Sequence, residues 1–151
     1  MSKNNLAFKT SFLYEYVYLY KMSDYLFSYG TLRMEQSHPM AGYLAKNSVL
    51  VGLGELKNAE LYKIDWYPAL IQTNNSEDIV YGDVFNVNND DVLLKIDEYE
   101  GIGIGNPPYE YRREKVKIRT ELNEVEAWVY FYNFDLPKEA EKVLSGDFLN
   151  P

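Results

Sequence analysis

The sequence predicts an α+β domain built on a curved or barrel-like β-sheet. Short runs of strand length recur between residues 25 and 132, and Gly, Asn and Pro residues separate them. Only two or three short segments have helical periodicity. The chain has 151 residues, of which 46% are hydrophobic and 16% aromatic, so it has the size and apolar content of one domain around one core. Many strands with few helices are typical of the α+β class.

Residues 1–21 differ from the rest of the chain. Between residues 14 and 20, tyrosines alternate with other residues as in a strand or an extended arm, but no turn residues join this segment to the next. Glu15 interrupts the segment, and it lacks the small-residue cleavage site of a signal peptide, so we expect a cytoplasmic protein. We predict an N-terminal extension over residues 1–21 and one domain over residues 22–151.

The elements of that domain follow in order along the chain. The apolar run 25–29 ends at Gly30, as a buried strand would, and residues 39–46 have the pattern of a short helix. Further strands are expected over residues 49–56, 59–64, 69–73 and 80–87. The strongest alternating pair covers residues 109–119 and 125–132, joined around Asn123, and residues 137–144 form a short helix or a turn.

The clearest helix covers residues 90–100. Asn88 or Asn89 precedes it as N-cap, acidic residues occupy its first turn, and Gly101 follows its end. At about 100° per residue, four apolar side chains gather on one face: Val92, Leu93, Ile96 and Tyr99. Glu100 falls on this same apolar face.

A carboxylate on an apolar helix face is unusual. Burial and the negative end of the helix dipole both disfavour its charged form, so the pKa of Glu100 should lie above the reference value of about 4.3. Such a group can exchange a proton near neutral pH, as a general acid/base must. Asp97 lies at the edge of the face and Glu98 well away from it. The structural alternative is that Glu100 pairs with Arg112 or Arg113, or reaches water at a frayed helix end.

The loop Tyr29-Gly30-Thr31-Leu32 ends the first core strand. Gly30 allows a tight turn whose backbone N–H groups, with the Thr31 hydroxyl, could bind a carboxylate or a developing oxyanion. Many strand ends have similar sequences, so a purely structural loop is the alternative.

The composition excludes several kinds of chemistry. Without Cys there is no disulfide framework, zinc ribbon, iron–sulfur cluster or thiol nucleophile, and His38, the single histidine, cannot build a multi-histidine metal site. We therefore expect no metal. A serine triad would need a Gly-x-Ser-x-Gly elbow, which is missing, so we expect His38 in a turn or at the surface. The glycine-rich stretch 101–105 follows a helix, whereas a dinucleotide fingerprint follows a strand, so we interpret it as a flexible loop.

The charge argues against two classes of partner. A formal net charge of −8 does not suit nucleic acid or an anionic membrane. Basic residues cluster between residues 112 and 119, but they alternate with acidic and apolar ones, which favours a solvated strand face over a phosphate-binding stripe. No apolar run approaches the roughly 20 residues of a membrane span.

Several segments occur in a characteristic order: Leu26-Phe27-Ser28-Tyr29-Gly30-Thr31-Leu32-Arg33, Glu60-Leu61-Tyr62, Trp66-Tyr67-Pro68-Ala69-Leu70, Val80-Tyr81-Gly82-Asp83-Val84-Phe85, Ile96-Asp97-Glu98-Tyr99-Glu100-Gly101, Tyr111-Arg112-Arg113 and Ala127-Trp128-Val129-Tyr130. Together they resemble the gamma-glutamylcyclotransferase-like family, and most closely its gamma-glutamylamine cyclotransferase and avirulence-induced-protein-like branch. The resemblance extends from about Tyr25 to Phe148.

The resemblance implies a small mixed β-barrel with flanking short helices, no cofactor, and a small-molecule gamma-glutamyl substrate. It implies a cavity in which the loop from Tyr29 to Leu32 holds the alpha-carboxylate end of the substrate, and it makes Glu100 the catalytic acid/base. In the implied reaction the substrate's alpha-amine attacks its own gamma-carbonyl, which gives 5-oxoproline and releases an amine or amino acid. Tyr29, Tyr99 and Tyr130 are candidate pocket walls.

Two features depart from the pattern of the family. Ala59 stands where the family often has Gly, and the loop over residues 101–108 is long and rich in Gly and Pro, which makes it a candidate lid or specificity loop. Because family membership alone does not secure an activity, two alternatives stay open. One is a non-catalytic module that binds a small carboxylate or amide, and the other is an interaction domain that uses the N-terminal arm.

Overall fold

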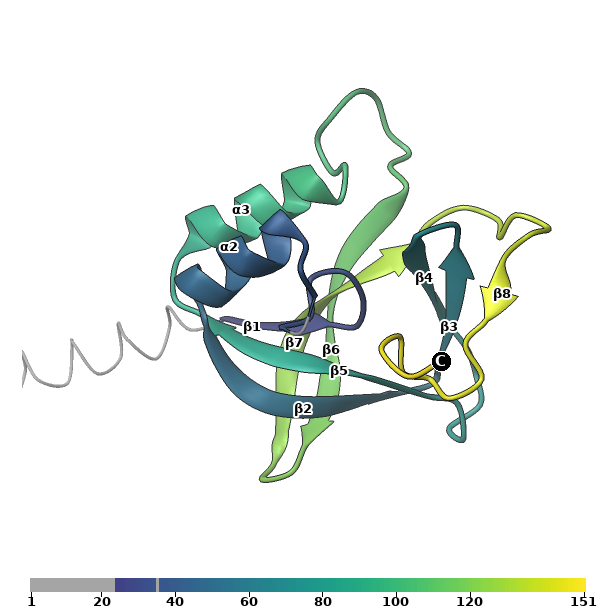
Figure 1. The fold of residues 1–151 in the computed structure, drawn as a ribbon, viewed down its shortest axis with the longest axis horizontal. Helices are drawn as coiled ribbons and strands as arrows, with labels where there is room; N and C mark the ends of the chain where they lie inside the picture. Colours follow the sequence, from purple (N-terminus) through teal and green to yellow (C-terminus); the bar gives the residue numbers. More distant parts are fainter. Residues whose placement is uncertain (1–23, 35) are drawn as a thin grey trace, which may run out of the picture.

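The computed structural model describes residues 24–34 and 36–151, which form a closed β-barrel, a second small sheet and two helices (Figure 1). In spatial order, the barrel strands are β1 (Asp24–Ser28), β5 (Ile79–Val87), β2 (Val49–Lys57), β6 (Tyr111–Thr120) and β7 (Glu124–Tyr132). β1 and β7 pair in parallel and close the barrel, while the other neighbours are antiparallel. The predicted α+β class and small mixed barrel are confirmed. The predicted extension over residues 1–21 lies outside the described residues.

The second sheet and the helices flank the barrel. The sheet has the order β4 (Tyr67–Gln72), β3 (Ala59–Ile64) and β8 (Glu141–Lys142). The helices are α2 (Pro39–Asn47) and α3 (Asp90–Tyr99), and they contact each other. Figure 1 shows the helices on one side of the barrel and the small sheet on the other, with the loop between α3 and β6 projecting beyond both. This loop and the two flanking layers surround the cavity described below.

The largest differences from the predicted elements lie in residues 137–144 and at the starts of β4 and β6, of which β6 begins at Tyr111 rather than at residue 109. Of the short helix or turn predicted over residues 137–144, the structure has the turn, together with the two-residue strand β8. Both β8 side chains are exposed, so no apolar alternation marks the strand, which is defined by its pairing with Tyr62 and Lys63 of β3. β4 begins two residues earlier than predicted and includes Pro68. An edge strand tolerates proline because it has one side without ladder hydrogen bonds.

Two hydrophobic clusters share β1. The barrel core fills the barrel interior and includes Phe27, Leu61 and Phe131, while the helix core lies between the helices and the barrel and includes Leu26 and Ile96. Leu26 and Phe27 are each 1% exposed and point to opposite faces of β1, as alternation along a strand requires. The loop after β1 is therefore fixed between both clusters.

Gly82 of β5 makes room for this arrangement. A Cβ atom at this position would lie 2.8 Å from the Phe27 ring and would meet the Ser28 carbonyl oxygen. Glycine is required here by the close approach of β1 rather than by an unusual backbone angle.

We expect Gly82→Ala to lower the free energy of unfolding by about 2–3 kcal/mol, because the new methyl group overpacks the contact between β5 and β1. The matched control is Gly42→Ala in helix α2, where nothing lies within 4 Å of the added Cβ. Alanine should stabilise that helix by about 0.5–1 kcal/mol. Urea denaturation midpoints measure both changes, and a Gly82→Ala midpoint equal to that of the parent would contradict the packing account.

Candidate active site

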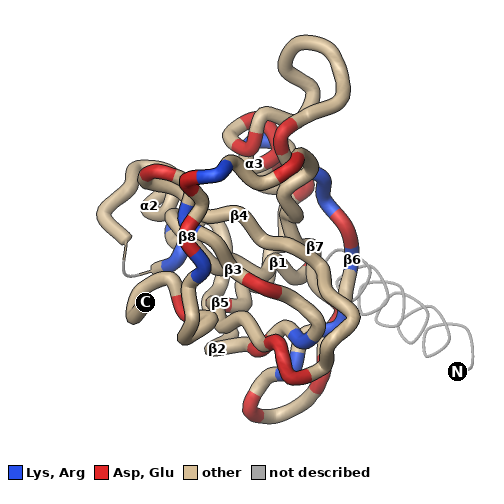
Figure 2. The backbone as a smooth tube through the Cα atoms, turned by 90° about the vertical axis from the view of Figure 1, so that its right-hand side faces the viewer, with Lys and Arg blue, Asp and Glu red and all other residues tan. Residues whose placement is uncertain are grey.

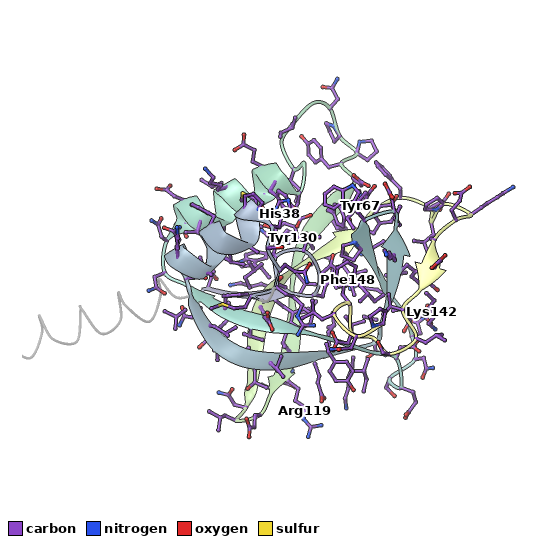
Figure 3. All side chains as sticks on the ribbon, viewed as in Figure 1. His38, Tyr67, Arg119, Tyr130, Lys142 and Phe148 are labelled. Atoms are coloured by element: carbon purple, nitrogen blue, oxygen red, sulfur yellow. The ribbon has the colours of Figure 1, made fainter. Side chains whose placement is uncertain are left out.

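A cavity of about 370 Å³ lies between the loop after β1, the end of α3, the start of β4 and the strands β6 and β7. All seven residues predicted for the site line it: Tyr29, Gly30, Thr31, Leu32, Tyr99, Glu100 and Tyr130. These residues come from three separate segments of the chain. In Figure 3, the labelled Tyr67 and Tyr130 lie on the side of the molecule from which the loop after α3 projects.

The loop after β1 presents its backbone to the cavity. The Arg33 N–H donates to the Gly30 carbonyl at 3.0 Å and closes a tight turn. A Cβ atom at Gly30 would collide with the Pro68 ring, so the loop and β4 can approach this closely only with glycine. The Thr31 hydroxyl lies 3.0 Å from the Tyr99 hydroxyl. Within the described residues, the N–H groups of Gly30, Thr31 and Leu32 donate to no protein acceptor, so they are available to a ligand.

Glu100 is held by the end of helix α3. It is the C-cap residue, and its N–H donates to the Ile96 carbonyl at 2.9 Å. Gly101 follows with φ +79, a conformation that commonly ends helices. The N-cap is Asn89, as one of the two predicted candidates. The backbone is therefore fixed on both sides of Glu100 while its side chain faces the cavity.

The Glu100 carboxyl has no ion-pair partner among the described residues. The predicted alternative of pairing with Arg112 or Arg113 is wrong, because Arg112 bonds Glu114 at 2.8 Å and Arg113 bonds Asp97 at 3.1 Å. Burial, followed by the carboxylates of Glu110 and Asp97, raises the pKa of Glu100 to about 8. The raised pKa agrees with the prediction from the helix face. The carboxyl is thus largely protonated at pH 7 and can exchange its proton in the neutral range.

Tyrosine hydroxyls fix the wall beside Glu100. Tyr130 donates to one oxygen of Asp97 at 2.6 Å, and Arg113 contacts the other oxygen. The Tyr29 hydroxyl donates to the Tyr130 carbonyl. Burial raises the pKa values of Tyr29 and Tyr130 well above their usual range, so both phenols stay neutral. They form a rigid, uncharged wall.

Glu110 and Tyr67 are lining residues that the sequence analysis missed. The Tyr67 hydroxyl donates to Glu110 at 2.8 Å, and this hydrogen bond is the largest cause that raises the pKa of Tyr67 to about 12. The sequence placed Glu110 inside a strand and Tyr67 just before one, and neither position carried a signal for the cavity. No Lys or Arg side chain lines the cavity among the described residues. Any anion bound here must therefore rely on N–H and O–H donors.

His38 and the basic cluster have the structural roles that were favoured. His38 accepts from the Met40 N–H at 3.1 Å and caps helix α2, with its ring stacked at 6.4 Å on Trp66. Along β6, blue and red segments follow one another in Figure 2. Four of its basic residues make ion pairs: Arg112 with Glu114, Arg113 with Asp97, Lys115 with Asp24 and Lys117 with Glu124.

Neither a candidate metal cluster nor a helix able to span a membrane occurs among the described residues. They contain no group of three or more His, Cys, Asp or Glu side chains that could hold a metal ion. Among the helices in the described ranges, none has the length and apolar character needed to cross a membrane.

The comparisons with known proteins agree on one family. The family model for "Gamma-glutamyl cyclotransferase, AIG2-like" matches residues 26–150. The curated protein named "Putative gamma-glutamylcyclotransferase MJ1514", from Methanocaldococcus jannaschii, is 37% identical over 111 residues, which are 72% of this chain and 84% of that protein.

Two solved structures show the same fold. YkqA from Bacillus subtilis aligns with a TM-score of 0.65 and 24% identity over 84% of this chain, which spans 40% of the longer YkqA chain. An AIG2-like protein from Mus musculus aligns with a TM-score of 0.61 and 19% identity over 77% of this chain and 81% of that one.

The raised pKa of Glu100 predicts a stability change in Glu100→Gln. An acid with a folded pKa of about 8 and an unfolded value near 4.5 binds its proton more tightly in the folded state, so its contribution to stability falls as pH rises between these values. Glutamine removes this loss. We expect the variant to unfold at the same temperature as the parent near pH 4.5 and at a higher temperature at pH 9. The difference in the free energy of unfolding at pH 9 has an upper bound of about 5 kcal/mol.

Thermal unfolding between pH 4.5 and pH 9 measures this difference. Glu98→Gln on the exposed side of the same helix is the control, and it should follow the parent at every pH. A difference between Glu100→Gln and the parent that does not grow with pH would rule out the raised pKa.

Proposed function

The chain belongs to the gamma-glutamyl cyclotransferase, AIG2-like family, and from this premise we propose that it is a cofactor-independent enzyme that cyclises gamma-glutamyl amides to 5-oxoproline. The released product is an amine or an amino acid. The observation that carries the proposal is the placement of Glu100. Its carboxyl, with a pKa raised to about 8 and no ion-pair partner among the described residues, lines the same cavity as the N–H groups of the loop after β1.

In the proposed reaction, Glu100 moves protons between two nitrogens of one substrate. The ionised Glu100 takes a proton from the substrate's alpha-ammonium group, and the freed amine attacks the gamma-carbonyl carbon. As the bond from that carbon to the leaving nitrogen breaks, Glu100 returns the proton to the leaving nitrogen. A second transfer of the same kind leaves the lactam neutral and the released amine protonated. The bound ammonium also favours the ionised form of Glu100, because an opposite charge lowers the pKa of a carboxyl.

The loop after β1 supplies the binding site for the substrate's alpha-carboxylate. Gly30, Thr31 and Leu32 offer backbone N–H groups whose dipoles can bind an anion. No Lys or Arg among the described lining residues competes for that role. Holding the carboxylate there while Glu100 faces the ammonium folds the substrate on itself. A well-oriented intramolecular attack can lower the activation barrier by roughly 7–11 kcal/mol. Tyr29, Tyr99 and Tyr130 form the walls that keep the folded shape.

Turnover of a substrate panel tests the proposed activity. We expect 5-oxoproline from at least one member of a set of gamma-glutamyl amines and gamma-glutamyl amino acids, measured by chromatography. Glu100→Gln should lower kcat by about 10²–10⁴-fold, because it removes the general acid/base. Glu98→Gln should keep the parent's kcat. If no member is turned over while 5-oxoproline still raises the melting temperature, the chain is a binding module instead.

The pH dependence of kcat/KM gives a second test. The free enzyme needs ionised Glu100, so kcat/KM should rise with pH through a midpoint near 8. Glu110→Gln removes a negative charge that raises this pKa and should move the midpoint to lower pH. Glu114→Gln changes a half-buried carboxylate that pairs with Arg112 and does not line the cavity, so it should leave the midpoint in place. Because the substrate ammonium is the same in all three proteins, the difference between midpoints reports Glu100 alone, and coinciding midpoints for parent and Glu110→Gln would refute its assignment.

A further inference from the structure

We propose that an ion cluster of buried Arg33 and Asp83 with half-buried Asp147 positions the loop after β1 for carboxylate binding, which makes the C-terminal tail a working part of the candidate active site. None of the three side chains lines the cavity, so they are positioning residues rather than catalytic ones. This inference rests on the proposed function in one respect, namely that the loop binds the carboxylate of the substrate or product.

Arg33 and Asp83 hold the end of the loop. Arg33 directly follows Leu32 in the sequence and is only 4% exposed. Its guanidinium lies 3.3 Å from Oδ1 of Asp83, while Oδ2 of Asp83 accepts the Met34 N–H at 2.8 Å. The Asp83 carboxylate of β5 thus binds both the Arg33 side chain and the Met34 backbone at the end of the loop.

Asp147 brings the tail to the same guanidinium. It bonds Nη1 of Arg33 at 2.6 Å, which is the shortest ion pair in the described structure. Asp147 is itself held, because it accepts the Leu149 N–H and the Asn150 side-chain amide, each at 3.0 Å. The tail is also joined to β5 by the Tyr81 N–H, which donates to the Gly146 carbonyl at 2.9 Å. Asp147 therefore holds Arg33 as a fixed part of the structure.

The cluster is one of three contacts that define the loop. Pro68 packs against Gly30, and the Tyr99 hydroxyl lies beside the Thr31 hydroxyl. Pro68 and Tyr99 both line the cavity. Arg33 fixes the remaining end from outside it. A buried charged cluster costs desolvation that an apolar contact would avoid, so it is a poor way to gain stability. What it offers is direction, because a guanidinium fork binds two carboxylates in one orientation.

The test compares two probes that differ only in the carboxylate: 5-oxo-L-proline and pyrrolidin-2-one. NMR titration of each into the full chain gives the dissociation constants. In Asp147→Asn, we expect affinity for 5-oxo-L-proline to fall by about fivefold or more and affinity for pyrrolidin-2-one to stay the same. If a gamma-glutamyl amide is turned over, its KM should rise in this variant, while kcat and the pH midpoint of kcat stay near those of the parent.

The matched control is Glu60→Gln. It removes the ion pair of 2.7 Å between Lys142 and Glu60, which also ties the C-terminal region to the domain but lies away from the loop. This variant should bind 5-oxo-L-proline as the parent does. Arg33→Lys keeps the charge but loses the fork, so it should show the same selective loss, and it replaces Asp147→Asn if that variant does not fold.

The outcomes separate this inference from the proposed function. Unchanged affinity for 5-oxo-L-proline in both Asp147→Asn and Arg33→Lys overturns it, and so does an equal loss in Glu60→Gln or an equal loss for both probes. If no gamma-glutamyl compound is turned over while the selective loss is still observed, the proposed activity fails and the positioning role stands. If turnover depends on Glu100 but Asp147→Asn does not change KM, the proposed activity stands and the positioning role fails.

Discussion

The burial of strand β1 on both of its faces is the constraint on which the rest of the molecule depends. Leu26 packs under the helices and Phe27 fills the barrel, so β1 belongs to both hydrophobic clusters. Its parallel pairing with β7 closes the barrel. A strand fixed from two sides cannot shift its register without moving both sets of side chains to the wrong environments. The backbone of the following loop therefore leaves the strand at a defined place, beside the end of α3.

The placement of Glu100 reflects a balance between stability and chemistry. A carboxyl that is partly buried, close to other carboxylates and without an ion-pair partner among the described residues is unfavourable for folding. The helix end fixes the backbone beside this carboxyl, because the N–H of Glu100 and that of Gly101 both donate to carbonyls of the last turn. Asp97, by contrast, forms an ion pair with Arg113 and accepts a hydrogen bond from the Tyr130 hydroxyl. The two carboxylates on neighbouring positions of one helix thus have different environments.

Local patterns predicted the features that depend on neighbours in the chain. The inward direction of Glu100 follows from helical periodicity, and the loop at Gly30 follows from the end of an apolar run. The contacts that complete the site could not be found in this way. Glu110 approaches Glu100 only because of the path of the loop after α3, and Arg33 meets Asp147 across 114 positions of sequence. The strand β8 is defined by its partner β3 rather than by its own residues. Such features arise from the closed barrel, which no single segment encodes.

The absence of basic side chains among the described residues that line the cavity has a consequence for the end of the catalytic cycle. In the proposed reaction, a gamma-glutamyl substrate enters as a zwitterion at its alpha-carbon, and its ammonium group compensates the acidic surroundings made by Glu100 and Glu110. In this reaction, cyclisation converts the ammonium to a neutral lactam nitrogen and passes the positive charge to the released amine. Once that amine has left, 5-oxoproline is an anion beside two carboxyl groups, with no Lys or Arg among the described lining residues. Like charges disfavour each other at short range. The lining that favours the zwitterionic substrate of the proposed reaction therefore binds the anionic product less tightly, and departure of the protonated amine promotes release of 5-oxoproline.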